Sequence, residues 1–435
     1  MKKVLIITNL LNVSTRMIGL AKYLSYFGYE TTILTMSKGE SPLENLGFSE
    51  KISDKIRIIE TPYRGDIFNF WRKVFRLLGF KKKSSILNQI KEKTAITSKK
   101  SFIDTVFDLY RAIFAYPDEE KRWKNPAVIV GSQLLKTEKF DVIISSSSPV
   151  TAHVVAYELK KEFNIPWIAD LRDLWSQNCN YNYGTLRKLI DRKLEIKTLS
   201  SANAITTVSG VWANDLIKLH NKKNIYVITN GFDPESVNLP PTELTKSFTI
   251  TYTGVLYRGK RDPLKLFSAL KELTRENIIN PNDIEVRFFG PKEEWIEKEI
   301  RENNLSNIVK QYGITDRMTS LQKQKESQIL LLLNWEDSRE KGVYTGKIFE
   351  YLAARRPILS VGGSGEDVIE KLIRETKAGF YSVTVNDIKR FLTEAYSEYK
   401  IIGKVIFDGD IKEINKYNLK EIAHKFVNLF NSITI

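Results

Sequence analysis

The sequence predicts an α/β protein with two Rossmann-like domains that face each other across a cleft. The chain has 435 residues, which is more than one ordinary hydrophobic core accommodates. In both halves, short apolar runs alternate with stretches of helical periodicity, the pattern of β–α–β units and a parallel sheet. A polar segment with three prolines, residues 232–247, interrupts this alternation and is predicted to be the interdomain linker.

The first half contains strands and helices in strict succession, apart from one interruption. Its predicted strands cover residues 2–9, 29–36, 55–62, 140–148, 165–171, 204–209 and 225–231. Its predicted helices cover residues 15–28, 149–164, 186–202 and 210–221. Residues 65–125 break the rhythm and are interpreted as a helical insertion.

The second half repeats the pattern after the linker. Its predicted strands cover residues 248–254, 284–290, 308–313, 328–334, 357–363 and 378–383. Its predicted helices cover residues 262–277, 292–304, 316–327, 346–356, 365–376 and, at the C-terminus, 418–433. The expected ligand site lies where strand ends and helix starts meet the cleft.

The net charge of +15 is concentrated in the insertion. Residues 64–100 contain eleven Lys or Arg and two acids, a net charge of +9, interleaved with five aromatic residues. This pattern favours a surface that meets anionic lipid headgroups. A solvated insertion with its aromatic residues in the core is the alternative. Nucleic-acid binding is not predicted, because no recognised module accompanies the charge.

Composition and targeting signals indicate a cytoplasmic protein, which the basic insertion would allow to lie on the inner face of the membrane. No apolar run reaches eighteen residues, so no transmembrane helix is expected. The N-terminal apolar run has five residues and no small-residue cleavage site, which favours a buried strand over a signal peptide. The single cysteine, Cys179, excludes an internal disulfide.

Three strand-to-helix turns of the second half are suited to anions. In "TYTGVLYRGKRDP", Gly254 ends a strand, and Arg258, Lys260 and Arg261 precede a helix start. In "VYTGKIFEYL", a second helix start bears Thr345, Gly346 and Lys347, with Glu350 one turn further on. The third turn is "SVGGSGED". A Lys and a Glu three residues apart also form ordinary surface pairs, but three such turns together indicate a diphosphate-plus-nucleoside pocket.

The sequence resembles GT-B glycosyltransferases of the retaining family 4 type. The resemblance is carried by "PWIADLRDLW", "ITTVSGVWANDL", "VITNGFDPE", "YTGVLYRGK" and "KIFEYLAARRPIL", in the order and spacing of the family. It covers nearly the whole chain except residues 65–125. It implies an acceptor domain at residues 1–232 and a nucleotide-sugar donor domain at residues 247–415. The helix in residues 416–435 would pack back on the N-terminal domain.

The resemblance also implies roles for single residues. Glu350 matches the glutamate that holds the donor ribose, and Lys260 matches the lysine that neutralises the donor diphosphate. Val255 stands where the family often has an arginine, so Arg258 or Arg261 would supply that charge. Gly342 stands where the family has the first glutamate of its E-x7-E pair. Glu340 and Glu336 are the nearby candidates for that role.

In the first half, the candidate acceptor-binding residues lie in the N-terminal loop and after a later strand. The loop offers Asn12, Ser14 and Arg16. The strand end "ADLRD" offers Asp170, Arg172 and Asp173, either for acceptor hydroxyls or for a structural Arg–Asp pair.

His153, in the first turn of a helix, is the nearest equivalent of a cleft histidine common in the family. It would reach the donor sugar, or else it is a packed helix residue.

The predicted function is a metal-independent, retaining transfer of a sugar to a glycan or lipid-linked acceptor, in cell-surface polysaccharide synthesis. No cofactor is expected, because the nucleotide-sugar is a substrate. The three histidines and one cysteine lack metal-ligand spacing, and "DGD" at residues 408–410 is interpreted as a turn. The alternatives are a sugar-nucleotide epimerase on the same fold and a catalytically silent nucleotide-sugar-binding protein.

Overall fold

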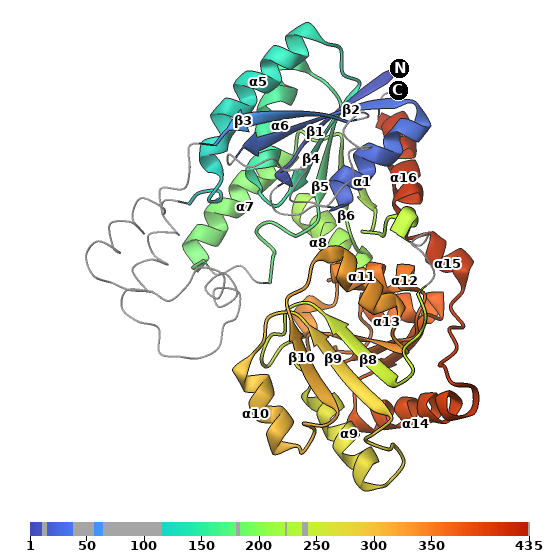
Figure 1. Ribbon diagram of the computed structural model, residues 1–435. Coiled ribbons are helices and arrows are strands. Elements are labelled where there is room, and N and C mark those ends of the chain that lie inside the picture. The colour runs from blue at the N-terminus through green and yellow to red at the C-terminus, as the bar shows by residue number, and fades with distance from the viewer. Residues whose placement is uncertain are drawn as a thin grey trace. The chain divides into compact units, whose positions relative to one another are not determined.

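The chain forms two units, each built on a parallel sheet of its own (Figure 1). The computed structural model describes residues 1–10, 15–37, 56–63, 115–179, 183–221, 224–236 and 242–433. The first unit comprises Met1–Thr229 and Ile422–Ile435, and the second comprises Asn230–Glu421. The predicted α/β class with two parallel-sheet domains is therefore confirmed.

The first unit contains a seven-stranded sheet of order β3-β2-β1-β4-β5-β6-β7. Its strands are β1 (Lys2–Ile7), β2 (Tyr29–Ser37), β3 (Ile56–Pro62), β4 (Val142–Ser147), β5 (Trp167–Leu171), β6 (Ala204–Thr207) and β7 (Ile225–Val227). Its helices are α1 (Thr15–Leu24), η2 (Ser25–Phe27), η5 (Lys121–Trp123), α5 (Lys124–Thr137), α6 (Thr151–Phe163), α7 (Thr185–Leu199), α8 (Gly210–His220) and most of α16 (Leu419–Ile433). All neighbouring strands run parallel.

The C-terminal helix α16 belongs mainly to the first unit. The Phe430 ring packs against Tyr29 of β2 at a centroid distance of 5.3 Å. The Arg16 guanidinium of α1 lies 5.5 Å from the Phe426 ring centroid. Both phenylalanines are buried, so α16 contributes to the core of the unit that begins the chain.

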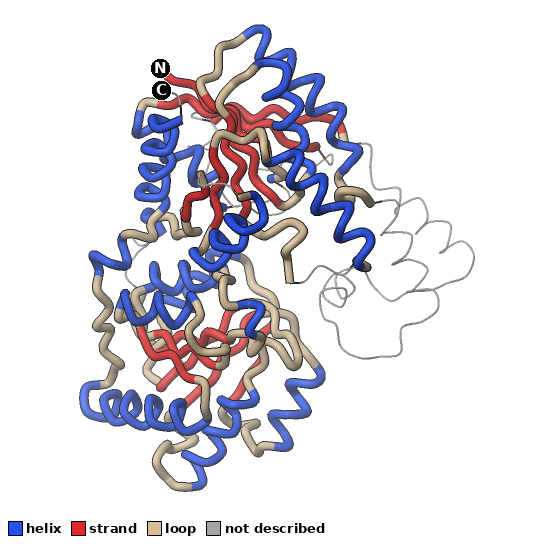
Figure 2. The backbone as a smooth tube through the Cα atoms, turned by 180° about the vertical axis from the view of Figure 1, so that it is seen from behind, coloured by secondary structure: helices blue, strands red, loops and turns tan. Residues whose placement is uncertain are grey.

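The second unit contains a six-stranded sheet of order β10-β9-β8-β11-β12-β13. Its strands are β8 (Phe248–Thr253), β9 (Ile284–Phe289), β10 (Val309–Gly313), β11 (Ile329–Leu333), β12 (Ile358–Val361) and β13 (Gly379–Ser382). Its helices are η6 (Pro234–Ser236), α9 (Leu264–Arg275), α10 (Glu294–Glu302), α11 (Arg317–Lys325), η7 (Ser338–Glu340), α12 (Gly346–Ala354), α13 (Val368–Thr376), α14 (Val385–Ile402) and α15 (Ile411–Asn415). In both units, helices lie on the two faces of the sheet (Figure 2).

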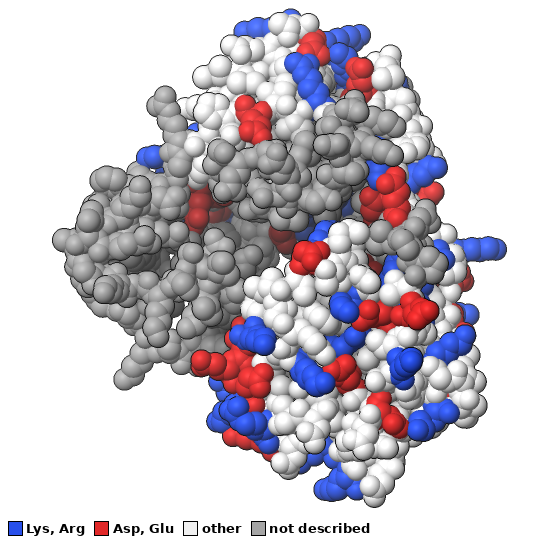
Figure 3. Space-filling model, in the orientation of Figure 1, with Lys and Arg blue, Asp and Glu red and all other residues white. Residues whose placement is uncertain are grey.

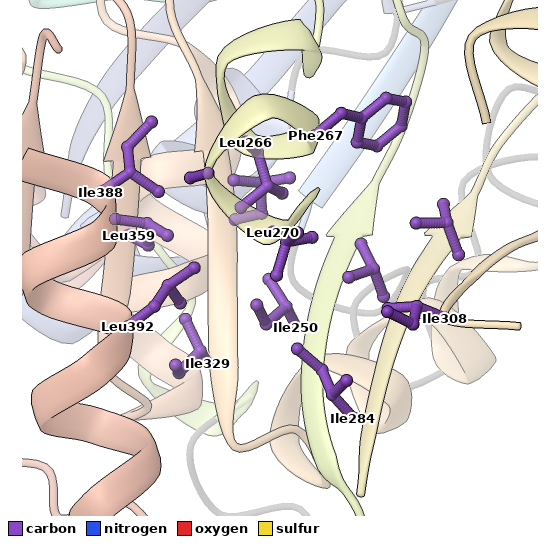
Figure 4. Close-up of a cluster of buried hydrophobic side chains, with 14 of the residues drawn as sticks. Ile250, Leu266, Phe267, Leu270, Ile284, Ile308, Ile329, Leu359, Ile388 and Leu392 are labelled. Carbon is purple, nitrogen blue, oxygen red and sulfur yellow. The ribbon is translucent and has the colours of Figure 1, made fainter. Parts of the chain in front are cut away.

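The six-stranded sheet separates two hydrophobic clusters. Successive side chains of a strand point to opposite faces, so Leu331 of β11 joins one cluster and its neighbour Leu332 joins the other. Both leucines are buried, as expected for a parallel strand covered on both faces. Leu266, Leu270 and Ile250 meet in the first cluster (Figure 4).

Helices α5 and α14 lie where the periodicity predicted no element. α14 begins at a capping box, in which the Thr384 hydroxyl accepts from the Asp387 N–H and the Asp387 carboxylate accepts from the Thr384 N–H.

Of the predicted insertion at residues 65–125, only residues 115–125 lie within the described ranges, and they contain η5 and the start of α5. No helix in the described part of the chain is long and apolar enough to cross a membrane.

The core of the second unit provides a stability prediction. Leu270 of α9 is fully buried, so Leu270→Ala leaves a cavity and is expected to lower the free energy of unfolding by about 2–5 kcal/mol. Ile401→Ala is the matched control, because that side chain is 82% exposed. Urea titration of both variants measures the difference, and equal unfolding midpoints would contradict the assignment of Leu270 to the core.

Candidate functional site

The candidate donor site lies at the carboxyl ends of β8 and β11 in the second unit. The chain proceeds from β8 to β9 and β10 on one side, then returns to place β11, β12 and β13 on the other side. The strand order therefore reverses between β8 and β11, which are hydrogen-bonded neighbours. Ligands of open parallel sheets bind at such a switch point.

Gly254, directly after β8, lies beneath the side chain of Lys347 from the start of α12. Gly254 has a φ of +124°, a conformation that favours glycine. A Cβ atom at this position would lie 2.3 Å from Lys347 Cε. A side chain here would displace the lysine, so the absence of a Cβ lets Lys347 cross the end of β8.

The four cations predicted from the sequence all lie against aromatic rings. Lys260 Nζ is 4.1 Å from the ring centroid of Trp335, the second residue after β11. The Arg261 guanidinium lies 5.3 Å from the same ring and 5.5 Å from that of Tyr257. Arg258 lies 6.0 Å from the Trp295 ring, and Lys347 Nζ lies 4.2 Å from the Tyr252 ring.

Aromatic contacts position these cations without neutralising them. Within the described ranges, none of the four has a carboxylate within 4.0 Å. An aromatic face has no formal charge and therefore does not compensate the cation, whereas an ion pair would. The β8–α9 loop and the start of α12 therefore present uncompensated positive charge at one edge of the sheet.

Lys347 is the most strongly perturbed of these cations. Burial and, to a smaller extent, the nearby Arg261 lower the pKa of Lys347 to about 7, although Glu350 acts in the opposite direction. Its ammonium donates a 2.7 Å hydrogen bond to the Tyr252 hydroxyl, which donates in turn to the Val255 carbonyl. Binding of an anion beside Lys347 would favour its charged form.

Further unpartnered groups gather near this edge. Gly346 and Lys347 are the first residues of α12, whose N–H groups have no acceptor within the helix. In the described part of the chain, the buried atoms Trp335 Nε1, Thr345 Oγ1 and Arg261 Nε make no hydrogen bond. A buried polar atom without a hydrogen bond is costly in a folded protein, so these three atoms are available to a bound ligand.

Glu350 lies in the second turn of α12 and is half-buried. Its Oε2 atom accepts a 3.3 Å hydrogen bond from Gln324 of α11, and its Oε1 atom lies 3.5 Å from Arg317. The same Gln324 amide donates to Thr253 at the end of β8. These contacts place the Glu350 carboxylate beside the candidate phosphate site and hold it there.

The departures from the family pattern also have defined positions. Gly342 is buried and follows η7. Glu336 is exposed, and its carboxylate lies 2.6 Å from Lys265 at the start of α9. Glu340 lies in η7.

The third turn, "SVGGSGED", contains a carboxylate of its own. Asp367 caps α13 and accepts a 2.6 Å hydrogen bond from the Tyr381 hydroxyl. A negative charge at this helix start makes it less suited to an anion than the other two turns. The three turns predicted as one anion site thus reduce to two.

Arg16 and Asp170, two candidate acceptor ligands, form a buried ion pair in the first unit. Arg16 donates from Nη2 to Asp170 Oδ1 at 2.9 Å and to the Ile228 carbonyl at 3.0 Å. Asp170 also accepts from Thr206 at 2.7 Å and from Ser146 at 2.9 Å. Burial acts to raise the pKa of Asp170, but Arg16 and Thr206 outweigh it, and the pKa is lowered.

The remaining candidates of the first unit differ in exposure. Arg172 donates to the Ser147 carbonyl at 2.8 Å, and Asp173 is exposed. The buried ion pair of Asp170 is therefore with Arg16 of α1, not with Arg172 of the same strand end. Asn12 and Ser14 lie outside the described residues.

His153 is fully buried in the first turn of α6. Its Nδ1 atom is 2.7 Å from Ser145 Oγ, which accepts a hydrogen bond from Trp167 Nε1. Burial lowers the pKa of His153 to about 3, so the ring is neutral at physiological pH. A catalytic role for His153 stays a prediction.

Potential metal ligands do not gather in the described part of the chain. No group of three or more His, Cys, Asp or Glu side chains there has metal-binding geometry. Asp410 of the "DGD" sequence caps α15 by accepting from the N–H groups of Lys412 and Glu413.

On the face shown in Figure 3, basic and acidic side chains are mixed over the second unit.

Sequence reasoning missed three residues of the candidate donor site. Tyr252 and Trp335 support the cations, and Gln324 orients Glu350. An aromatic residue at the carboxyl end of a predicted parallel strand was the available signal for both rings. Gln324 had no such signal, because α11 is mostly polar and the burial of Gln324 depends on tertiary packing.

Comparisons with known proteins agree with this architecture. Residues 101–236 match the model of Glycosyltransferase Family 4. The chain is similar to HepE of Anabaena, solved in complex with UDP and glucose, with a TM-score of 0.62 and 11% identity over 99% of this chain and 100% of that chain. It is similar to sucrose-phosphate synthase of Thermosynechococcus elongatus, with a TM-score of 0.59 and 11% identity over 100% and 99% of the two chains.

The chain has the GT-B fold, and its residues 101–236 match the Glycosyltransferase Family 4 model. TarM of S. aureus, solved as a variant with fondaparinux, alpha-GlcNAc-glycerol and UDP, is also similar to this GT-B protein. Its TM-score is 0.58, with 14% identity over 99% of this chain and 100% of that chain. No curated protein sequence matches. The predicted family resemblance is thereby confirmed.

The buried ion pair of this GT-B protein provides a test of Asp170. Asp170→Asn leaves the Arg16 charge buried without its counter-charge, so we expect unfolding free energy to fall by about 3–5 kcal/mol. Asp408→Asn is the control, since substitution of this exposed side chain changes stability by about 0.5 kcal/mol or less. Urea titration followed by circular dichroism compares the two, and an unchanged midpoint for Asp170→Asn would rule out a structural role.

Proposed function

We propose that the protein transfers a sugar from a nucleotide-diphosphate sugar to a glycan or lipid-linked acceptor. The observation that carries this proposal is the set of cations at the switch point of the second unit. Lys260, Arg261 and Lys347 lie against Trp335 or Tyr252, and no carboxylate of the described residues lies within 4.0 Å of them. Their charge is available to a ligand with more than one negative charge, as a diphosphate has.

The cations would promote transfer by stabilising the departing nucleoside diphosphate. Negative charge develops on the diphosphate when the bond to the sugar breaks, and cations fixed beforehand stabilise it without reorganisation. We assign this role to Lys260, Lys347 and the first N–H groups of α12. Arg261 shares the Trp335 ring with Lys260 and lowers the pKa of Lys347, so it supports the same site more directly than Arg258.

Glu350 is proposed to bind the ribose of the donor. A carboxylate accepts hydrogen bonds from both hydroxyls of a diol, and Glu350 lies one turn along α12 from Lys347. Gln324 and Arg317 keep the carboxylate in place on the α11 side.

The remaining parts of the proposal concern the acceptor side and the cell. We propose that the first unit binds the acceptor, that the anomeric configuration is kept and that no metal is required. A role in cell-surface polysaccharide synthesis is supported by the resemblance to TarM and to the lipopolysaccharide outer core galactosyltransferase WaaB. The proposed contact of residues 64–100 with the inner membrane face falls outside the described residues.

A thermal-shift screen followed by a turnover assay tests the proposed function. UDP-, GDP-, ADP- and CMP-sugars are added to the full chain, and one of them is expected to raise the unfolding midpoint because it binds the folded state. The same donor is then tested for release of its nucleotide. Binding without release would favour the silent binding protein, for which Val255 and Gly342 are the supporting departures.

Glu350→Ala is expected to weaken donor binding by about 1–3 kcal/mol, about 5- to 150-fold, through the loss of hydrogen bonds from the ribose to a charged acceptor. The matched measurement uses the corresponding 2′,3′-dideoxy nucleoside diphosphate, which lacks both hydroxyls. Wild type and variant should bind this analogue equally well. If Glu350→Ala loses as much affinity, relative to wild type, for the analogue as for the natural diphosphate, Glu350 does not bind the ribose.

The lowered pKa of Lys347 predicts pH-dependent donor binding. The charged lysine binds the diphosphate, so affinity is greatest below pH 7 and falls as the pH rises through the pKa of about 7. Between pH 7 and pH 8.5 the dissociation constant of the nucleoside diphosphate should rise about tenfold. Lys347→Arg keeps its charge throughout this range and should remove the dependence. Calorimetry measures both, and the same slope in the two proteins would contradict the role of Lys347.

A further inference from the structure

Helix α7 of the first unit has an unusual distribution of polarity. Most surface helices bury their aliphatic side chains and expose their charged ones. In α7, Arg187, Asp191 and Glu195 are buried, whereas Leu186, Leu189 and Ile190 are exposed. The fifteen-residue helix therefore presents aliphatic side chains to its surroundings on the side opposite its charged anchors.

Polar contacts explain how α7 is attached to the unit. Arg187 donates to Asp191 at 2.9 Å and to the carbonyls of Ala115 and Pro117 at 2.9 and 3.0 Å. Glu195 accepts from the Ser176 N–H at 3.0 Å. These buried bonds fix which side of α7 faces inward, so the helix cannot rotate to cover its leucines without breaking them.

The exposed aliphatic residues share one face. Leu186, Leu189, Ile190 and Ile196 are 73%, 52%, 44% and 38% exposed. Their separations of three, four and ten residues place them along one side of an α-helix. An isolated exposed leucine is ordinary, but four on one face of one helix form a patch.

The charge of this exposed face has a single sign. Lys188, Arg192, Lys193 and Lys197 are all exposed. The only acids of α7, Asp191 and Glu195, are buried on its inner side. The outer side therefore combines aliphatic residues with positive charge and has no acid of its own.

We propose that the outer face of α7 is a docking surface for an anionic phospholipid membrane. Here the outer face means Leu186, Leu189, Ile190 and Ile196 together with the exposed Lys188, Arg192, Lys193 and Lys197. A helix with this composition lies in the plane of the bilayer interface. Its aliphatic side chains enter the acyl boundary, and its basic side chains reach the headgroups. The proposal does not depend on the donor site, which lies in the other unit, or on residues 64–100.

Charge argues for lipid rather than for a second copy of the chain. Lys193 and Lys197 lie on the same side of the helix as the exposed leucines. Two copies packed through this face would bring these lysines together in a desolvated contact, where like charges repel. Phosphatidylglycerol or another anionic headgroup instead provides the opposite charge.

Vesicle flotation of the full chain tests the proposal. One set of vesicles contains phosphatidylcholine alone, and the other contains equal parts of phosphatidylcholine and phosphatidylglycerol. The aliphatic variant is Leu186→Ser/Leu189→Ser/Ile190→Ser, with Ile401→Ser/Ile402→Ser/Ile406→Ser as its control, since those three isoleucines are also exposed. The charge variant is Lys193→Glu/Lys197→Glu, with the exposed Lys271→Glu/Lys412→Glu as its control.

Wild type and both controls are expected to float with the anionic vesicles, less at high salt, and poorly with phosphatidylcholine alone. Each α7 variant should reduce the partition coefficient at least about tenfold. Circular dichroism verifies that every variant is folded. If the serine variant is unfolded, the charge variant alone still tests the proposal. Flotation of both α7 variants equal to that of their controls would overturn the proposal. The absence of wild-type flotation would also overturn the proposal. If, in that case, sedimentation velocity finds a dimer that the α7 variants abolish, the outer face of α7 binds a second copy of the chain instead of lipid.

Discussion

The contact between the Lys347 ammonium and the buried Tyr252 side chain fixes the geometry of the candidate donor site. Tyr252 belongs to β8 and Lys347 to the start of α12, so this contact joins the central strand of the sheet to the helix that follows β11. It also depends on Gly254, because a Cβ there would meet the lysine side chain. One strand end, one glycine and one helix start thus determine where the positive charge lies.

The aromatic rings of the site hold several cations close together without compensating their charge. Cations gathered at one edge repel each other, and ion pairs with carboxylates would hold them at the cost of cancelling their charge. Lys260 and Arg261 instead share the Trp335 ring, and Lys347 lies against Tyr252. The remaining repulsion is visible in the lowered pKa of Lys347, to which Arg261 contributes after burial. A bound anion would relieve that repulsion, which supports the proposal that the site binds a ligand with several negative charges.

The sequence was sufficient for the architecture because parallel strands are short apolar runs and their order follows from the alternation with helices. Strands such as β11, with five consecutive Ile or Leu residues, admit few other interpretations. Helix α14 was missed although its capping box, Thr384 with Asp387, is a local signal. In the site, the charges were predicted, but the rings that hold them were missed, because an aromatic residue at a strand end also fits a core position. A tyrosine in a buried strand resembles core until the helix above it is placed. The pairing of Asp170 with Arg16 joins residues 154 positions apart and has no local signature.

The central claim is that Lys347 and Lys260 meet the diphosphate of a nucleotide donor. Acetylation of lysines in the full chain, followed by mass spectrometry, tests it directly. The account predicts that UDP, or whichever nucleoside diphosphate raises the unfolding midpoint most, protects Lys347 and Lys260, while the nucleoside alone does not. The exposed Lys271 should react equally in all samples. Equal reactivity of Lys347 and Lys260 with and without the diphosphate would contradict the account.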